Sequence, residues 1–438
     1  MKFQEKLLYS HIAFEELFDV NNPIHDKRLE ALKIFEKKGF PTRKDEAWKY
    51  TSLNSLINRD YALFPKKETP IELKKVKKFF LYEIDTYKII FIDGVYSPFL
   101  SDTTHDGLDV CLMSAALSKF KYRKIIERYF GKAAENKDSL TALNTSYTRE
   151  GAYIYVPKNI VAEKPIEIIH FSTGKEESIW LQPRNLIVLD SNSQVQIIER
   201  HQSLKSHEVV TNSVTEIYTN RDALLDYYKI QNDLSSSSLI DNTYISQEKN
   251  STASVHTFSL GGKIVRNNLN FFHNGQRINS TLKGITILDG DQHVDHYTLV
   301  KHSEPNCESF QEYKGIFSEK SRGVFNGKIF VESLAQKTNA FQQSNNLLLD
   351  DMATVNTKPQ LEIFADDVKC SHGCTIGQLD NDALFYLRSR GVPKKEAKAL
   401  LTYAFANNIL DGVQLPVIKK RIKSLISKKL GVNLGFDL

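Results

Sequence analysis

The sequence has only four cysteines among its 438 residues: Cys111, Cys307, Cys370 and Cys374. So few thiols argue against a disulfide framework. The N-terminal stretch carries Lys2, Glu5 and Lys6 where a secretory signal needs an uninterrupted apolar run. Long apolar runs are lacking throughout, since none approaches the roughly 20 residues of a membrane-spanning helix. These absences predict a soluble, cytoplasmic protein with no membrane partner.

An excess of charge of one sign is also lacking. The 58 basic and 53 acidic residues give a formal net charge of +5, which is too mild and too evenly mixed to predict a nucleic-acid partner. Local catalytic signatures are missing as well, because the chain has no phosphate-binding loop, no Gly-x-Ser-x-Gly elbow and no His-Glu-x-x-His helix. We therefore do not expect the chain to hydrolyse ATP through such a loop, and a non-enzyme is favoured.

What is present divides the chain into three regions. Residues 1–150 mix helical and strand patterns, with a helix expected from Asp26 to Gly39 and a β-hairpin turn at Asp93-Gly94. Residues 151–378 consist of short apolar runs separated by Asn, Ser, Gly and Asp, which is typical of successive strands. Residues 379–438 return to helical periodicity. The fold class is therefore mainly β with helical or mixed ends.

The strand region favours a solenoid over a closed sandwich. A sandwich or barrel holds about 100 to 250 residues of this kind, whereas a solenoid accepts any length. Leu282–Ile285 and Tyr313–Ile316 share the letters Lys-Gly-Ile and recur 31 residues apart, which indicates neighbouring rungs of a β-helix. The terminal rungs of such a fold are open strand edges that must be capped or paired. The expected strands include 152–156, 166–171, 185–189, 195–198, 254–258, 278–287, 324–331 and 360–364.

Three candidate metal ligands alternate near the end of the strand region. Cys370, His372 and Cys374 would share one face of a strand. At about 3.3 Å per residue, however, the two sulfurs lie roughly 13 Å apart, too far to share one tetrahedral ion. Either Gly373 bulges the strand, or a second polypeptide supplies the missing ligands. The plainer alternative is that the cysteines pack as small apolar residues.

A second group of candidate ligands lies upstream, and its role stays open. By type, its residues suit zinc or iron. On a strand, however, residues three apart point to opposite faces. A structural role is therefore favoured over a metal site. The group is His293, His296, His302 and Cys307.

The C-terminal region predicts three helices. Asp380 is placed to cap the first, Gly391 to end it, and Pro393 to open the second. The second helix carries an apolar stripe at helical spacing: Ala397, Leu400, Leu401, Ala404 and Phe405. The third, from Pro416 to about Leu430, combines an apolar face with a run of basic residues, which by default form a solvated face.

Several long motifs resemble the SufB/SufD family of the SUF iron-sulfur cluster assembly machinery. The motifs are Asp45–Thr51, Phe325–Val331, Ala335–Gln342, Asn346–Leu349, Lys358–Gly373, Gly377–Asp380 and Leu384–Gly391. The resemblance implies a right-handed parallel β-helix flanked by terminal domains, paired with SufB through the β-helix and bound to the ATPase SufC through the C-terminal helices. SufC would supply ATP hydrolysis, and this chain would be a scaffold. The expected ATPase-binding residues are Leu384, Phe385, Arg388, Arg390, Leu401 and Phe405.

The same resemblance implies a nascent iron-sulfur cluster at the interface with SufB. His372 matches the family's histidine and ranks first as a ligand, Cys370 second and Cys374 third. SufB chains typically carry His-Glu where this chain has His372-Gly373, which points to the SufD branch. Two departures are Cys374, where alanine is common, and Asn339, where aspartate is common. No cofactor is expected to bind stably to the chain alone, the cluster would be transient in the complex, and a flavin in the complex is left open.

Three other interpretations compete with this scaffold. A β-helix also serves polysaccharide lyases and hydrolases, although these are usually secreted and line a groove with carboxylates. The chain is alternatively a purely structural subunit whose Cys and His residues only pack. A homodimer through the open edge is a further alternative when SufB is absent.

Overall fold

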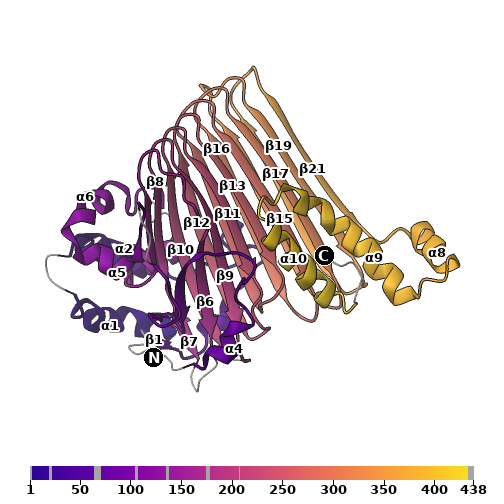
Figure 1. The fold of residues 1–438 in the computed structure, drawn as a ribbon, viewed down its shortest axis with the longest axis horizontal. Coiled ribbons are helices and arrows are strands. Elements are labelled where there is room, and N and C mark those ends of the chain that lie inside the picture. Colours follow the sequence, from indigo (N-terminus) through magenta and orange to yellow (C-terminus); the bar gives the residue numbers. More distant parts are fainter. Residues whose placement is uncertain are drawn as a thin grey trace.

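The computed structural model describes residues 2–18, 22–63, 71–103, 107–134, 138–173, 178–206 and 208–432. Two long sheets run side by side and are stacked rung upon rung, so the strand region forms the parallel β-helix expected from the sequence (Figure 1). N-terminal helices lie at one end of the solenoid, and the C-terminal helices lie toward the other (Figure 1). Among the described residues, no helix combines the length and apolar character needed to cross a membrane.

The solenoid alternates its strands between the two sheets. Consecutive strands from β8 onward fall on opposite sheets, and each pairs in parallel with the strand two elements away. One sheet contains β4 (Asp109–Leu112), β5 (Ala152–Val156), β8 (Arg184–Leu189), β10 (Val209–Thr219), β12 (Ser237–Gln247), β14 (Ile264–His273), β16 (His293–His302), β18 (Arg322–Val331) and β20 (Thr354–Ile363), with β1 (Ala62–Leu63) and β7 (Ile179–Leu181) at its side. The other contains β2 (Tyr87–Ile92), β3 (Val95–Tyr96), β6 (Ile166–Ser172), β9 (Gln194–Ser203), β11 (Leu224–Gln231), β13 (Thr252–Ser259), β15 (Asn279–Leu288), β17 (Glu308–Phe317), β19 (Asn339–Leu348) and β21 (Lys369–Gly377).

The repeated tetrapeptides do lie on neighbouring rungs, but two residues out of register. Gly284 pairs with Tyr313, and Leu282 pairs with Gln311. A shift of two residues leaves every side chain on its original face, so the hydrophobic pattern alone does not distinguish the two alignments. The true register places Leu282 and Tyr313 together in the apolar interior of the solenoid.

The N-terminal region packs on the outside of the solenoid. Trp48 is buried, and the guanidinium of Arg266 on β14 lies 4.0 Å from the centre of its ring. Thr51 donates a hydrogen bond to Asp295 on β16, and Glu46 forms an ion pair with Lys358 on β20. The helical elements of this region are α1 (Phe3–Glu15), α2 (His25–Lys38), η1 (Glu46–Trp48), α3 (Asn54–Ile57), α4 (Leu73–Lys77), α5 (Met113–Ser118), α6 (Phe120–Tyr129) and α7 (Ser139–Ser146).

The C-terminal helices begin where the sequence predicts. Asp380 accepts a hydrogen bond from the backbone N–H of Asp382, and Gly391 has a φ of +87° just after the first helix. The elements are α8 (Asn381–Ser389), α9 (Lys394–Asn407), η2 (Asn408–Gly412) and α10 (Pro416–Lys429).

The second C-terminal helix is confirmed as α9, but its predicted apolar stripe is only partly buried. Of its members only Ala397 is buried, while Leu400, Leu401 and Phe405 are half-buried and Ala404 is exposed. The helix turns a face with small side chains and one tyrosine toward η2 and β17, because small residues permit a close approach. The buried residues are Ala397, Ala399, Thr402, Tyr403 and Ala406.

Candidate functional site

The last strand, β21, places the three predicted ligands on its inward face. Cys370, His372 and Cys374 pair with Ala340, Gln342 and Ser344 of β19. All three of these partners are buried inside the solenoid. Because aligned residues of parallel strands share a face, the predicted ligands continue the interior columns of the preceding rungs.

This last rung is uncovered. β21 and β20 each end their sheet, and no strand follows them among the described residues. The side chains that face inward on β21 are therefore reached by solvent, with His372 and Cys374 exposed and Cys370 half-buried. An edge of this kind presents unpaired backbone groups and a row of side chains to any partner chain.

β20 contributes a residue that the sequence motifs do not single out. The hydroxyl oxygen of Thr357 lies 2.8 Å from the sulfur of Cys374, so a hydrogen bond links the two strands of the last rung. Thr357 pairs with Phe325 on β18, whose ring lies in the interior core. No sequence motif indicates that Thr357 lies near Cys374. Its inward position follows from the pairing of β20 with β18.

Gly373 does not bulge the strand. β19 and β21 pair without interruption, from Asn339 opposite Lys369 to Leu347 opposite Gly377. Because a regular strand rises about 3.3 Å per residue, Cys370 and Cys374 stay too far apart to bind one tetrahedral ion together. Of the two routes considered from the sequence, only a second polypeptide remains to complete a cage here.

The two cysteines of β21 differ in environment. Cys370 packs beside the apolar cluster that contains Ile329, Ala340 and Ala365. Burial raises the pKa of its thiol, so the neutral form is favoured. Cys374 is exposed. The packing alternative therefore describes Cys370 better than Cys374.

The upstream group of histidines does not converge on one point. On β16, His293 faces outward, where its Nε2 lies 2.8 Å from the hydroxyl of Thr51. His296 faces inward between Asn267 and Thr286, with burial lowering its pKa to about 4. Opposite faces are what their spacing predicts.

The remaining two members of that group also have local partners. His302 hydrogen-bonds the imidazole of His273 and the hydroxyl of Ser309, and burial lowers its pKa to about 3. The thiol of Cys307 donates to the carbonyl of Gly275 at 3.2 Å. These contacts are compatible with the structural role that the sequence favoured, and that role stays a prediction.

The predicted ATPase-binding residues separate into two environments. α8 has no buried residue and projects away from the solenoid, with Phe385 72% exposed (Figure 1). Leu384 is half-buried, and Arg388 and Arg390 are exposed. On α9, Leu401 is half-buried and Phe405 contacts Lys314 of β17, whose Nζ donates to the Phe405 carbonyl.

The sequence motifs did not indicate a further cluster of possible metal ligands, which lies inside the solenoid. His170, Glu199 and His201 lie close together on β6 and β9, near the N-terminal end. In the sequence, Glu199 and His201 alternate, and His170 lies 31 residues before His201. Without the strand register, this pattern does not differ from that of an ordinary strand.

Comparison with known proteins identifies the family of the chain. Residues 170–405 match the family model described as SUF system FeS cluster assembly, SufBD core domain, and residues 12–168 match the SufBD protein N-terminal region. The chain is a subunit of the SUF iron-sulfur cluster assembly system, and it belongs to the SufB/SufD family.

Curated relatives match this chain over most of its length. The iron-sulfur cluster assembly protein SufD of Escherichia coli is 31% identical over 96% of this chain and 96% of its own length. An iron-sulfur cluster assembly SufBD family protein of Synechocystis is 32% identical over 92% of this chain and 90% of its own length. The SufD protein of Bacillus subtilis is 28% identical over 71% of each chain.

Proposed function

We propose that this chain is a non-ATPase scaffold that pairs with SufB and SufC, so that a nascent iron-sulfur cluster is assembled where its last rung meets SufB. The observation that carries the proposal is the open edge of β21, which presents His372 and Cys374 beside unpaired strand backbone. The family membership supports this assignment and gives no support to a polysaccharide lyase or hydrolase.

His372 is proposed as the principal ligand from this chain. It is exposed, whereas the column that it continues is buried from Leu282 through Gln311 to Gln342. A neutral imidazole suits iron, and a ligand at the end of an open column remains available to a metal held partly by another chain. Cys374 is exposed beside it in the strand pattern, while Cys370 is the more packed of the two thiols.

The test is His372→Ala in the complex with SufB and SufC. We expect the three proteins to co-purify and ATP hydrolysis by SufC to persist, while cluster formation falls at least tenfold on anaerobic reconstitution, followed by thiolate-to-iron absorption. The matched control is Ser371→Ala, which changes the neighbouring exposed residue on the other face of β21. Full cluster yield in His372→Ala would reject the assignment and favour a purely structural subunit.

The open edge of β21 could instead pair with a second copy of this chain. A homodimer through β21 would bury the same residues when SufB is absent. Sedimentation of the chain alone and after addition of SufB distinguishes the two cases. We expect SufB to displace any self-association and to form a one-to-one pair, whereas a dimer that persists beside SufB would place the SufB contact elsewhere.

We further propose that α8 provides the first contact for SufC. The helix exposes Phe385 and Tyr386 on a projecting element that has no buried side chain of its own. Two exposed aromatic side chains next to Arg388 and Arg390 are typical of residues that dominate interface energies. Phe405, by contrast, is held against β17 and serves to anchor the helices.

The test of this contact is Phe385→Ala. Truncating a central aromatic anchor costs at least about 2 kcal/mol, which weakens SufC binding roughly thirtyfold. The matched control is Phe120→Ala, an aromatic residue that is 83% exposed on α6 at the opposite end of the molecule. Equal losses in both variants, measured by calorimetric titration with SufC, would remove α8 from the interface.

A further inference from the structure

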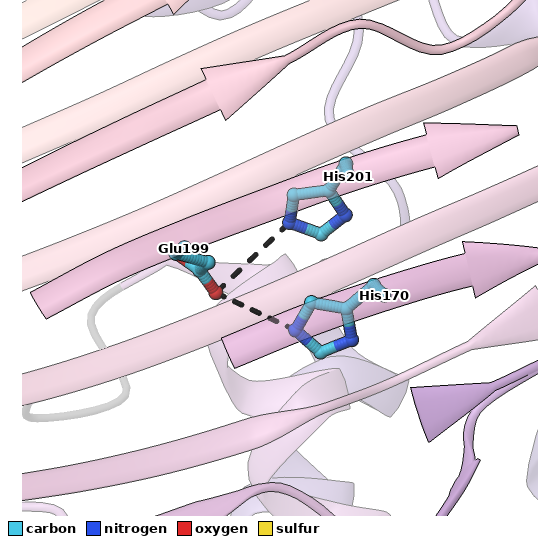
Figure 2. Close-up of side chains that lie close together, drawn as sticks. All are labelled: His170, Glu199 and His201. Atoms are coloured by element: carbon cyan, nitrogen blue, oxygen red, sulfur yellow. Dashed lines mark ion pairs between the residues drawn. The ribbon is translucent and has the colours of Figure 1, made fainter. Parts of the chain in front are cut away.

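Three potential metal ligands meet in the interior of the solenoid. Glu199 and His201 extend from β9, and His170 extends from the neighbouring strand β6, where it pairs with His201 (Figure 2). The Oε1 atom of Glu199 lies 3.6 Å from Nε2 of His170 and 3.9 Å from Nε2 of His201. All three ligand atoms lie within 4.8 Å of one another.

The distances between these ligand atoms are close to those expected around a bound metal ion. Bonds of about 2.0–2.2 Å from nitrogen and oxygen ligands put neighbouring ligand atoms of a tetrahedral site roughly 3.3–3.6 Å apart. The two nitrogen-to-oxygen distances are therefore near their bound values. The two imidazole nitrogens, which lie within 4.8 Å of each other, would have to move closer together to bind one ion.

Both imidazole nitrogens lack a hydrogen-bond partner among the described residues. Nε2 of His170 and Nε2 of His201 are buried and unsatisfied, although each is directed at Glu199. The side chain of His201 is only 5% exposed. A buried polar atom without a close partner is costly, and an ion between these two nitrogens and the carboxylate oxygen would satisfy all three atoms.

The carboxylate is held so that one oxygen faces the histidines. Oε2 of Glu199 accepts a hydrogen bond of 2.5 Å from the hydroxyl of Tyr227 and lies 3.4 Å from Nζ of Lys229. Oε1 accepts a single hydrogen bond of 3.3 Å from the amide of Asn185. Because a carboxylate oxygen has two lone pairs, Oε1 keeps one for a further partner. Outer contacts of this kind orient metal-binding carboxylates.

The local charge admits a cation. Lys229 forms its shorter ion pair with Asp241, at 2.5 Å, so its charge is shared between two carboxylates. Glu199, Asp241 and Lys229 together carry one net negative charge in a buried environment. A divalent ion beside Glu199 would add positive charge where carboxylates outnumber cations, and uncompensated buried carboxylate charge is unfavourable.

A cavity leads to the two histidines. It has a volume of about 80 Å³ and is lined by His170, His201, Gln182 and Asp233, among others. This space is sufficient for an ion with water molecules in its open coordination positions.

We propose that His170, Glu199 and His201 form a binding site for a divalent first-row transition-metal ion inside the solenoid, separate from the last rung. Two imidazoles and one carboxylate suit Fe²⁺, Zn²⁺ and Co²⁺, and they leave positions open on the ion. The site lies on β6 and β9, while His372 lies on β21 at the other end of the solenoid (Figure 1).

The competing explanation is a structural stack. The rings of Phe91, His170 and His201 lie one above another, with centroid separations of 5.1 Å and 4.6 Å and nearly parallel planes. A stack requires flat rings but no nitrogen. His170→Phe therefore separates the two explanations, because it keeps the ring and removes the ligand atom.

The experiment uses the full chain, without a polyhistidine tag, carrying Cys370→Ser, His372→Ala and Cys374→Ser so that the last rung contributes no ligand. After treatment with chelator, the protein is titrated anaerobically with Co²⁺. We expect a single equivalent to bind, with visible d–d absorption, and to raise the Tm. His170→Phe and, separately, His201→Phe in this background should keep the metal-free Tm within a few degrees and lose both the absorption and the metal-dependent rise.

Two results would overturn the proposal. One is the absence of Co²⁺ binding in the parent protein, and the other is undiminished binding in both histidine variants. His256→Phe is the matched control, because His256 is another buried strand histidine whose ring stacks on Tyr228, but on the outer face of its strand beneath the C-terminal helices. It should leave Co²⁺ binding unchanged. The last-rung ligands are absent from every variant, so the outcome is independent of the proposed role of His372.

Discussion

The two ends of the solenoid are built from the same kind of strand but are finished differently. At the N-terminal end, the short antiparallel strands β3 and β4 pair with β2 and β5, and helices lie against the first rungs (Figure 1). At the C-terminal end, β20 and β21 finish the sheets, and His372 is exposed. Inward-facing side chains become part of the core at the end that strands and helices cover. At the uncovered end they remain available to a partner.

At the N-terminal end, a buried ion pair stabilises the packing of the covering segment on the solenoid. Arg184 on β8 and Glu216 on β10 are fully buried against each other. The Glu216 carboxylate also accepts hydrogen bonds from the backbone N–H groups of Gly131, Ala133 and Ala134, which follow α6. One side chain thus binds the covering segment to the solenoid.

The largest effect is expected from Glu216→Gln. This change leaves the guanidinium of Arg184 buried without its counter-charge, which costs about 3–5 kcal/mol. The free energy of unfolding, measured in urea, should fall by that amount. The covering segment after α6 should also lose protection in hydrogen exchange.

The matched control for this change lies on the open end. Glu362 of β20 pairs with Lys328 at 2.7 Å, with side chains 40% and 26% exposed. Glu362→Gln should cost no more than about 1 kcal/mol, because partly exposed pairs contribute little. Similar losses from the two variants would contradict the distinction between a fastened end and an open one.

The next effect concerns pH and the buried interior between the two ends. His302 has a pKa lowered to about 3 by burial, against an ordinary value of 6.5. As the pH falls below 6.5, the unfolded chain binds a proton that the folded chain does not. Stability is therefore complete above pH 6.5 and declines toward pH 3, by about 1.4 kcal/mol per pH unit for this one histidine.

The measurement is the free energy of unfolding between pH 7.5 and 5 for the parent and for His302→Gln. The amide keeps a donor and an acceptor near His273 and Ser309, and it does not titrate. We expect the variant to lose stability less steeply by about 1 kcal/mol per pH unit, on the same basis. An equal slope in both proteins would assign the acid sensitivity to other groups.

Much of the fold was accessible from the sequence because it depends on local pattern. Alternating apolar residues and polar breaks predicted strands such as 152–156, which the structure confirms as β5. Asp380 and Gly391 predicted the bounds of α8, because capping is decided by residues within one helical turn. These features need no knowledge of distant parts of the chain.

What the sequence did not reveal depends on register between rungs. The pairing of Gly284 with Tyr313 differs by two residues from the apparent repeat, and both alignments satisfy the same alternation. The contact between Thr357 and Cys374 and the meeting of His170 with His201 arise from residues far apart in sequence. Motif spacing predicted Cys370, His372 and Cys374 as candidates because they lie on one strand.

The smallest effect on stability is expected at the open end, where the readout is chemical. Cys374 is exposed, Cys370 and Cys111 are half-buried, and Cys307 is buried, with burial raising the pKa of the last three thiols. A disulfide reagent such as DTNB should therefore modify a single thiol rapidly in the folded chain. Cys374→Ser should abolish this fast phase while changing the free energy of unfolding by no more than about 0.5 kcal/mol.

Two further measurements connect this thiol to the comparison of the ends. Cys111→Ser, at the covered end, should leave the fast phase intact, because its thiol is shielded by neighbouring side chains. Addition of SufB should slow the reaction of Cys374 if the partner covers the last rung. A fast phase that survives Cys374→Ser would show that the reactive thiol lies elsewhere, and one that SufB leaves unchanged would mean that β21 stays open in the complex.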